Sequence, residues 1–220
     1  MNVLVFAPHP DDELLGCGGT IAKHINNGDS VFACIVTTGC EPLFNQESVD
    51  KTRNETKKAH AFLGIKETIY LNYPAANIES CPRYELNKSI RQVVMSVKPT
   101  IIYMPHYGDM QKDHELVADA IMVSIRPRGD ISVKKVYSYE TLSETEWNYP
   151  YVHKAFVPQH FVDISSFLET KINALSFYKS QLVASPAARS LQNVECLAKL
   201  RGSTIAVQAA EAFMVIREIE

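Results

Sequence analysis

Ionisable side chains are concentrated in a short segment near the N-terminus, His9-Pro10-Asp11-Asp12-Glu13. His9 and Asp12 are three residues apart across a turn, so both side chains can reach one point, whereas Asp11 must leave the backbone in another direction. An imidazole and a carboxylate suit zinc, and a neighbouring carboxylate that is not a ligand suits a general base. On this segment alone a structural interpretation is equally open: Asp11 or Asp12 could cap a following helix, and Glu13 could favour its positive end.

A second group of polar residues lies between residues 105 and 114 and ends in Asp113-His114. His114 could supply a third zinc ligand, and three protein ligands leave a coordination position for water, as catalytic sites require. Asp113 is placed to orient an imidazole. In the alternative interpretation this segment is a surface loop in which Asp113 caps a helix and the histidines are incidental. We prefer the ligand role for His114 and the incidental role for His24, His60, His106, His153 and His160.

Each polar segment follows an apolar run typical of a buried strand and precedes a helical pattern. The strands are predicted at residues 3–6 and 100–104, and the helices at about 14–27 and 114–125. In an open parallel sheet, ligands collect at the edge formed by the carboxyl ends of the strands. The two polar segments are therefore expected to meet at one edge, which is why His114 is favoured as a ligand.

The order of the other predicted strands and helices indicates the fold class. Strands are predicted at residues 31–36 and 68–71, and helices at 48–63, with Gly64 as the C-terminal cap, and at 85–97. This alternation over about 125 residues predicts an α/β fold with a mostly parallel sheet covered on both faces. Beyond it the pattern is less regular, with strands at 135–140 and 161–163 and a helix at 166–180. Residues 1–220 are expected to form a single domain.

Composition narrows the class of protein. The formal net charge of -3 gives no reason to expect nucleic acid or an anionic membrane surface as a partner. The apolar segment at residues 2–7 is too short to span a bilayer and is typical of a first strand, so neither membrane insertion nor a secretory signal is expected. The five cysteines are scattered and form no C-x-x-C pair, which favours reduced thiols and a cytoplasmic location.

The N-terminal motif also carries a family resemblance. Residues 7–20, Ala-Pro-His-Pro-Asp-Asp-Glu-Leu-Leu-Gly-Cys-Gly-Gly-Thr, resemble the signature of the LmbE-like, PIG-L-type deacetylase family. Asp113-His114 matches the DH motif of that family. Further similar features are Arg53 and Glu55, Ala59 with Leu63-Gly64, Val162-Asp163-Ile164, Lys171, Ser180-Gln181 and Ala210-Glu211-Ala212-Phe213.

The resemblance implies a Rossmann-like three-layer α/β/α fold, a zinc ion (Zn2+) and hydrolysis of an acetamide. The substrate would be an N-acetylated amino sugar or sugar conjugate, whether free, nucleotide-linked or glycoside-linked. Carried over by position, the zinc ligands are His9, Asp12 and His114, the general base is Asp11, and Arg53 faces the substrate. Because the family often assembles, a homo-oligomer is the default expectation.

Two positions depart from the family pattern. Many members have a histidine three residues before the metal-binding histidine, where this chain has Gln111. That histidine is thought to assist the tetrahedral intermediate. Gln111 can donate a hydrogen bond in its place but cannot carry a positive charge or transfer a proton. Many members also carry an aspartate near the position of Ala75, where it would accept hydrogen bonds from sugar hydroxyls.

Three alternatives remain open. The first is a zinc hydrolase of a different small amide, which the residues Gln111 and Ala75 favour. The second is a protein that retains zinc but has impaired catalysis. The third is a nucleotide-binding module, suggested by Gly16-Cys17-Gly18-Gly19, although the third glycine of the dinucleotide fingerprint is missing.

Overall fold

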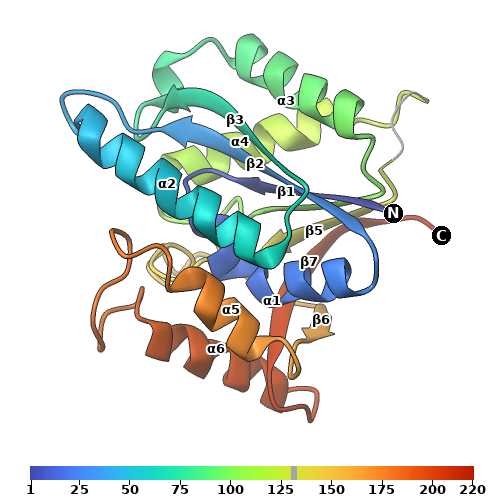
Figure 1. Cartoon of the computed structure of the whole chain (residues 1–220). Helices are drawn as coiled ribbons and strands as arrows, with labels where there is room; N and C mark the ends of the chain where they lie inside the picture. Colours follow the sequence, from blue (N-terminus) through green and yellow to red (C-terminus); the bar gives the residue numbers. More distant parts are fainter. Residues whose placement is uncertain (130–132) are drawn as a thin grey trace.

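A computed structural model describes residues 1–129 and 133–220 of the chain. In this part of the chain a seven-stranded sheet has the order β3-β2-β1-β4-β5-β7-β6 (Figure 1). The strands are β1 (Asn2–Ala7), β2 (Ser30–Thr38), β3 (Glu67–Pro74), β4 (Ile101–Pro105), β5 (Lys135–Tyr139), β6 (His160–Asp163) and β7 (Ala210–Glu218). Neighbouring strands from β3 to β5 are parallel, and β7 is antiparallel to both β5 and β6.

Helices cover both faces of the sheet, as Figure 1 shows. They are α1 (Asp12–Asn26), α2 (Gln46–Leu63), α3 (Arg83–Val97), α4 (Lys112–Ser124), α5 (Leu168–Leu175) and α6 (Leu191–Ser203), with short 3-10 turns at Ile78–Ser80 and Val152–Lys154. Alternate side chains of β1 enter opposite core layers, as the two-residue period of a strand requires. Leu4 and Phe6 pack in the layer of α3 and α4, whereas Val3 and Val5 pack in the layer of α1, α2, α5 and α6. The predicted three-layer α/β/α fold with a mostly parallel sheet is therefore confirmed.

Strand β1 lies between β2 and β4, at the point where the strand order reverses direction. The chain leaves β1 toward α1 and later leaves β4 toward α4. Because these neighbouring strands are parallel, the turns that follow them lie side by side. The two polar segments found in the sequence are therefore brought together at the carboxyl edge of the sheet.

Several element boundaries differ from the predicted ones. Helix α1 begins at Asp12 and α4 at Lys112, each two residues earlier than the pattern indicated, and β3 is longer than expected. The helix predicted over 166–180 is confirmed only over Leu168–Leu175. The chain leaves α5 five residues earlier than predicted and then turns to bury Tyr178. Helix α6 and strand β7 had no predicted counterpart.

The glycines of α1 lie where neighbouring elements pack closely against the helix. A Cβ atom at Gly16 would come within 2.3 Å of the Tyr139 ring, and one at Gly19 within 2.7 Å of Ile164. The glycines thus allow β5 and the C-terminal half of the chain to approach α1 closely. They lie inside the helix rather than in a loop before it, so the nucleotide-binding interpretation of this segment is wrong.

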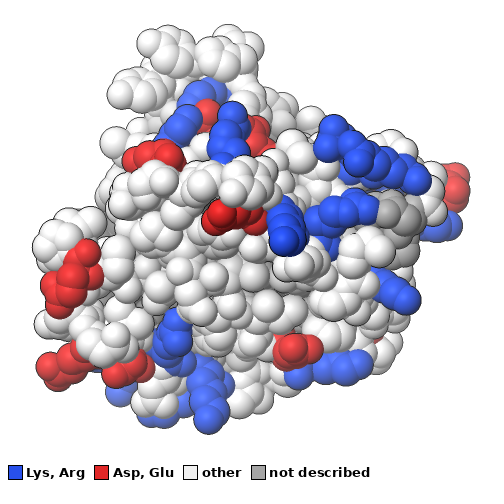
Figure 2. Space-filling view, turned by 90° about the horizontal axis from the view of Figure 1, so that it is seen from above, with Lys and Arg blue, Asp and Glu red and all other residues white. Residues whose placement is uncertain are grey.

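No helix in the described ranges is both long and apolar enough to cross a membrane. Figure 2 looks down on the molecule from the side of α3 and shows basic and acidic side chains intermixed among larger areas of other residues. Arg83 of α3 and Asp119 of α4 form an ion pair of 3.2 Å.

Candidate active site

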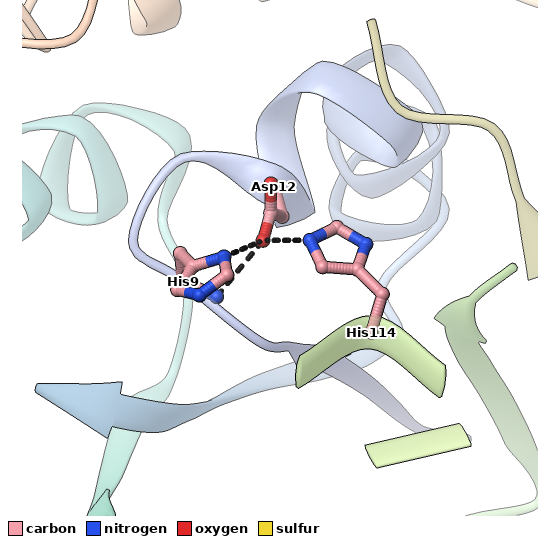
Figure 3. A group of neighbouring side chains, drawn as sticks. All are labelled: His9, Asp12 and His114. Atoms are coloured by element: carbon pink, nitrogen blue, oxygen red, sulfur yellow. Dashed lines mark hydrogen bonds and ion pairs between the residues drawn. The ribbon is translucent and has the colours of Figure 1, made fainter. Parts of the chain in front are cut away.

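Three side chains from the two polar segments converge at the carboxyl edge of the sheet. Oδ2 of Asp12 lies 3.4 Å from Nδ1 of His9 and 3.3 Å from Nε2 of His114. Figure 3 shows this oxygen between the two imidazole rings, whose centroids are 5.3 Å apart. His9 lies in the turn after β1, Asp12 is the first residue of α1, and His114 lies in the first turn of α4. The three residues predicted as ligands are therefore adjacent.

Two of the three spacings between the donor atoms fit a tetrahedral metal ion. Ligand atoms bound to zinc at about 2.0–2.1 Å in tetrahedral geometry lie about 3.3–3.4 Å apart. The two distances from Asp12 match this spacing, and the three donor atoms all lie within 4.8 Å of one another. Within the described residues, Nε2 of His114 and Oδ1 of Asp12 are buried without a hydrogen-bond partner. Buried polar atoms are normally paired, so these unpaired atoms support a metal-binding role.

In each imidazole the ring nitrogen that does not face Asp12 is hydrogen-bonded to a carboxylate, which fixes the orientation of the ring. Nε2 of His9 lies 2.9 Å from Oδ2 of Asp113, which also accepts a 2.6 Å hydrogen bond from the amide of Ala76. Nδ1 of His114 lies 2.8 Å from Oδ2 of Asp109. Carboxylates in such positions set the tautomer and raise the basicity of a metal-binding histidine. Nδ1 of His9 and Nε2 of His114 are thereby left to face Asp12.

Sequence reasoning anticipated one of these two carboxylates. Asp113 does contact an imidazole, although it is that of His9 rather than of its neighbour His114. The interpretation of Asp113 as a helix cap is wrong, because its side chain accepts from Ala76 and His9. Asp109 was missed, and its only signal was membership of the same polar segment. Its second oxygen accepts a 2.6 Å hydrogen bond from Thr145.

The two imidazoles hold protons strongly when no metal is present. Burial lowers the pKa of His9, but the hydrogen bonds to Asp113 and Asp12 outweigh it and raise that pKa to about 9. Burial likewise opposes the protonated form of His114, and the carboxylates of Asp12 and Asp109 raise its pKa to about 10. The pKa of Asp12 is well below its usual range, because the two histidines outweigh the effect of burial. A metal ion would therefore replace protons at this site.

Asp11 occupies an unusual backbone conformation. Its φ is 102°, in the left-handed region that an L-residue rarely adopts, and its amide donates a 3.2 Å hydrogen bond to Glu13. It stands at the N-cap position of α1, yet among the described residues its side chain makes no capping hydrogen bond. The interpretation of Asp11 as a helix cap is therefore wrong. Strain of this kind is concentrated at functional sites.

The carboxyl group of Asp11 is buried, and its Oδ1 has no hydrogen-bond partner in the described part of the chain. Burial raises the pKa of Asp11 well above its usual value; Arg189 opposes this effect, and Asp12 and Glu13 reinforce it. A carboxyl group with a raised pKa is a better proton acceptor near neutral pH than an ordinary aspartate.

Glu13 has a structural role at the same turn. Its Oε1 lies 2.9 Å from Nε2 of His60 and accepts a 2.7 Å hydrogen bond from the Tyr178 hydroxyl. Its Oε2 accepts from the amide of Asp11. Glu13 therefore connects α2 and the segment after α5 to the turn that carries Asp11. This contact, rather than the helix dipole alone, accounts for a buried glutamate here.

A cavity of about 690 Å³ adjoins the cluster. His9 and Asp113 reach it at one end, and Arg53 and Ala75 form part of its wall. Arg53 contacts Thr38 and Asn72 and lies 5.2 Å from the centre of the Tyr70 ring. It is thus at the cavity surface expected for a substrate-facing residue, and its role in binding stays a prediction. The segment between α5 and α6 contributes Ser180, Gln181 and Arg189 to the cavity wall.

Gln111 and Arg189 meet at Glu144. The side-chain amide of Gln111 donates a 3.0 Å hydrogen bond to Oε1 of Glu144, and Nη2 of Arg189 lies 3.6 Å from the same oxygen. Nη1 of Arg189 lies 3.2 Å from Oδ2 of Asp11. Arg189 was missed by sequence reasoning, because it lies 178 residues from Asp11 and no local motif marks it.

Of the histidines outside the cluster, His106 is a packing residue. His106 is fully buried, and its Nε2 lies 2.9 Å from the carbonyl of Lys154. His106 therefore lies in the interior, although Tyr107 and Met110 of the same segment are exposed. In the described ranges, His9, Asp12 and His114 are the one group of three or more side chains with metal-ligand spacing.

Comparisons with known proteins find relatives named as deacetylases. The chain is 27% identical over 188 residues to "Uncharacterized deacetylase YaiS" of Escherichia coli, covering 81% of this chain and 91% of that protein. It is 28% identical over 195 residues to diacetylchitobiose deacetylase of Thermococcus kodakarensis, covering 82% and 70%. The crystal structure of the 4-carboxy-2-hydroxymuconate hydratase GalB from Pseudomonas putida has the same fold, with a TM-score of 0.82, 16% identity and coverage of 100% and 97%.

The family comparison covers the part of the chain that holds the cluster. The PIG-L family, described as GlcNAc-PI de-N-acetylase, matches residues 4–125, which is more than half of the chain. This range contains His9, Asp11, Asp12, Asp113 and His114. The chain belongs to the PIG-L family of deacetylases.

Proposed function

We propose that this protein is a zinc-dependent hydrolase that removes an N-acetyl group from an amino sugar or sugar conjugate. The observation that carries the proposal is the cluster of half-buried His9 with buried Asp12 and His114, next to the unpaired carboxyl oxygen of Asp11. Three ligands and a neighbouring base are the parts that a hydrolytic zinc site needs. The family and the deacetylase relatives support the reaction class.

When bound, zinc would polarise the amide carbonyl and lower the pKa of a bound water to about 7. Asp11 is placed to accept a proton from the attacking water as the water oxygen bonds to the acetyl carbon. Asp11 then delivers the proton to the amine as the carbon–nitrogen bond breaks, which yields acetate and the free amino group. Asp113 and Asp109 hold the imidazoles of His9 and His114 in the tautomers that leave Nδ1 and Nε2 for the metal.

The cavity supports a small-molecule substrate. Its volume of about 690 Å³ lies within the range of about 300–1,000 Å³ for ligand pockets. The relative from Thermococcus is named for deacetylation of diacetylchitobiose, a disaccharide with two acetamide groups. All five cysteines are free thiols, which supports a reducing, cytoplasmic compartment for the reaction.

A second candidate is a zinc hydrolase of a less polar amide. Ala75 lies near the position where many members carry an aspartate, and the cavity wall also includes Ala76, Phe44 and Val49. GalB has the same fold but is named as a hydratase, so the fold alone does not determine which reaction is catalysed. An apolar substituent on the substrate would suit this wall better than additional hydroxyl groups.

The test is acetate release from a panel of N-acetylated sugars in free, nucleotide-linked and glycoside-linked form, together with N-acetylated aliphatic and aromatic amines. The protein is loaded with zinc, and Asp11→Asn serves as the inactive control. Release from a sugar that is lost in the variant supports the proposal. Release from the apolar amides alone supports the second candidate. Zinc binding without release from any compound would contradict both.

A further inference from the structure

Arg189 brings a positive charge to the candidate active site from the C-terminal half of the chain. Four basic residues line the cavity: Lys51, Arg53, Lys112 and Arg189. Lys112 pairs with Glu115 at 2.9 Å, and Lys51 is exposed. Among the described residues, Arg189 is the one of the four that contacts Asp11, at 3.2 Å. Arg189 therefore connects the cavity wall to Asp11.

The guanidinium is held firmly but retains free donors. Its Nε donates a 2.6 Å hydrogen bond to Ser143, and its Nη1 donates to Asp11. Nη2 lies 3.6 Å from Glu144 and 3.9 Å from Asp12, both too far for a hydrogen bond. A guanidinium has five N–H groups. Two are used, so three remain without a hydrogen-bond partner in the described part of the chain, beside the cavity.

The backbone around Arg189 also restricts its movement. Its carbonyl accepts a 3.0 Å hydrogen bond from Val183, and the next residue, Ser190, caps α6. The same segment is anchored to α2, because Glu55 accepts hydrogen bonds from Ser180. Donors that are fixed in this way before the reaction stabilise developing charge most effectively.

We propose that Arg189 is a catalytic residue that supplies the positive charge for which Gln111 is unsuited. This role rests on the proposed function. As water adds to the acetamide carbon, the carbonyl oxygen gains negative charge, and Nη2 of Arg189 donates a hydrogen bond to it. No proton is transferred from the guanidinium. Gln111 stays bound to Glu144 and neutral, and Nη1 of Arg189 stays on Asp11.

The test compares Arg189→Met with Arg201→Met. Arg201 is a matched control, because it pairs with Glu140 at 2.6 Å and its side chain is 23% exposed, against 19% for Arg189. On the sugar that the unaltered protein deacetylates, Arg189→Met should lower kcat about 100- to 1,000-fold. The value of KM, the zinc content and the melting temperature should change little. Arg201→Met should retain the kcat of the unaltered protein.

Two further measurements separate catalysis from packing. A phosphonamidate analogue of the substrate, with a tetrahedral anionic centre, should bind Arg189→Met about 100-fold more weakly, as measured by calorimetry. Adding Gln111→His to Arg189→Met should restore part of kcat, since a histidine can carry the missing charge. Unchanged kcat in Arg189→Met, or a loss that follows zinc content or melting temperature, would overturn this role alone. If the unaltered protein deacetylates nothing, the proposed function falls as well.

Discussion

Two buried groups of charged side chains lie against α1 and differ in how fully they are paired. At the start of the helix, Oδ1 of Asp11, Oδ1 of Asp12 and Nε2 of His114 have no hydrogen-bond partner within the described residues. Along its middle, Lys171 donates to the carbonyl of Leu15 at 2.7 Å and to Glu211 at 2.6 Å. Within the described residues the charged side chains of this second group are paired, and the unpaired buried atom beside them is the Thr20 hydroxyl, which carries no charge.

The second group forms a closed network. The two oxygens of Glu211 accept hydrogen bonds from the amides of Gly19 and Thr20, at 2.9 and 2.7 Å. These contacts join β7 and α5 to the helix that carries Asp12. A buried charge that is fully paired fixes the relative position of the elements that it joins. Buried polar atoms without a partner are available to bind a ligand. Pairing therefore separates the scaffold from the site, although both are buried and charged.

The largest effect is expected from Asp11→Asn, because an amide cannot accept the proton of water. Deacetylation should fall about 100- to 10,000-fold, as expected for the loss of a general base. Zinc content and melting temperature should stay close to those of the unaltered protein. Acetate release, metal analysis and thermal unfolding measure the three quantities. Asp29→Asn changes a carboxyl group just before β2, at the opposite edge of the sheet, and should leave turnover unchanged. Full activity in Asp11→Asn would remove Asp11 from its proposed role.

Lys171→Met should affect stability rather than chemistry. It leaves Glu211 buried without its cation, which typically costs about 3–5 kcal/mol of unfolding free energy. Chemical denaturation measures this change, and zinc affinity should be retained while the protein is folded. Lys199→Met is the matched control, since Lys199 pairs with Glu195 at the same 2.6 Å but is exposed. Equal destabilisation by both variants would show that burial of the pair is unimportant.

The pH dependence of zinc binding tests the first group, which contains the metal-ligand candidates. In the metal-free protein, His9 and His114 are protonated below their pKa values of about 9 and about 10. Zinc binds the neutral imidazoles, so each ion displaces about two protons near pH 7, and its affinity should rise about 100-fold per pH unit up to about pH 9. Calorimetry in two buffers of different ionisation enthalpy counts these protons. Binding without proton release would contradict the assignment of the two histidines.

Asp109→Asn should give the smallest of these effects. The variant loses the carboxylate that orients His114, so zinc affinity should fall about 10- to 100-fold. Competition with a chelator measures the affinity. Asp119→Asn changes an exposed carboxylate on α4 and should leave zinc binding unaltered. If Asp109→Asn binds zinc as tightly as the unaltered protein, the hydrogen bond to His114 does not contribute to the metal site.

Local pattern was sufficient for the zinc-ligand candidates and for most of the scaffold. His9 and Asp12 lie between the first predicted strand and helix, and His114 opens the helix that follows the strand predicted at 100–104. Parallel strands place these connections at one edge. The alternation of strands and helices likewise predicted the confirmed α/β fold. These features depend on spacing within about fifteen residues, which hydrophobic periodicity reveals.

The contacts that complete the site depend on tertiary packing. Asp11 is adjacent to Asp12 in sequence, yet its contact with Arg189 spans 178 residues and follows from a turn after α5 that was predicted as helix. Asp109 and Glu13 were visible as charged residues, but their partners Thr145, His60 and Tyr178 come from other elements. Periodicity reports which face of an element is buried, and only the packed chain determines which distant side chain meets it there.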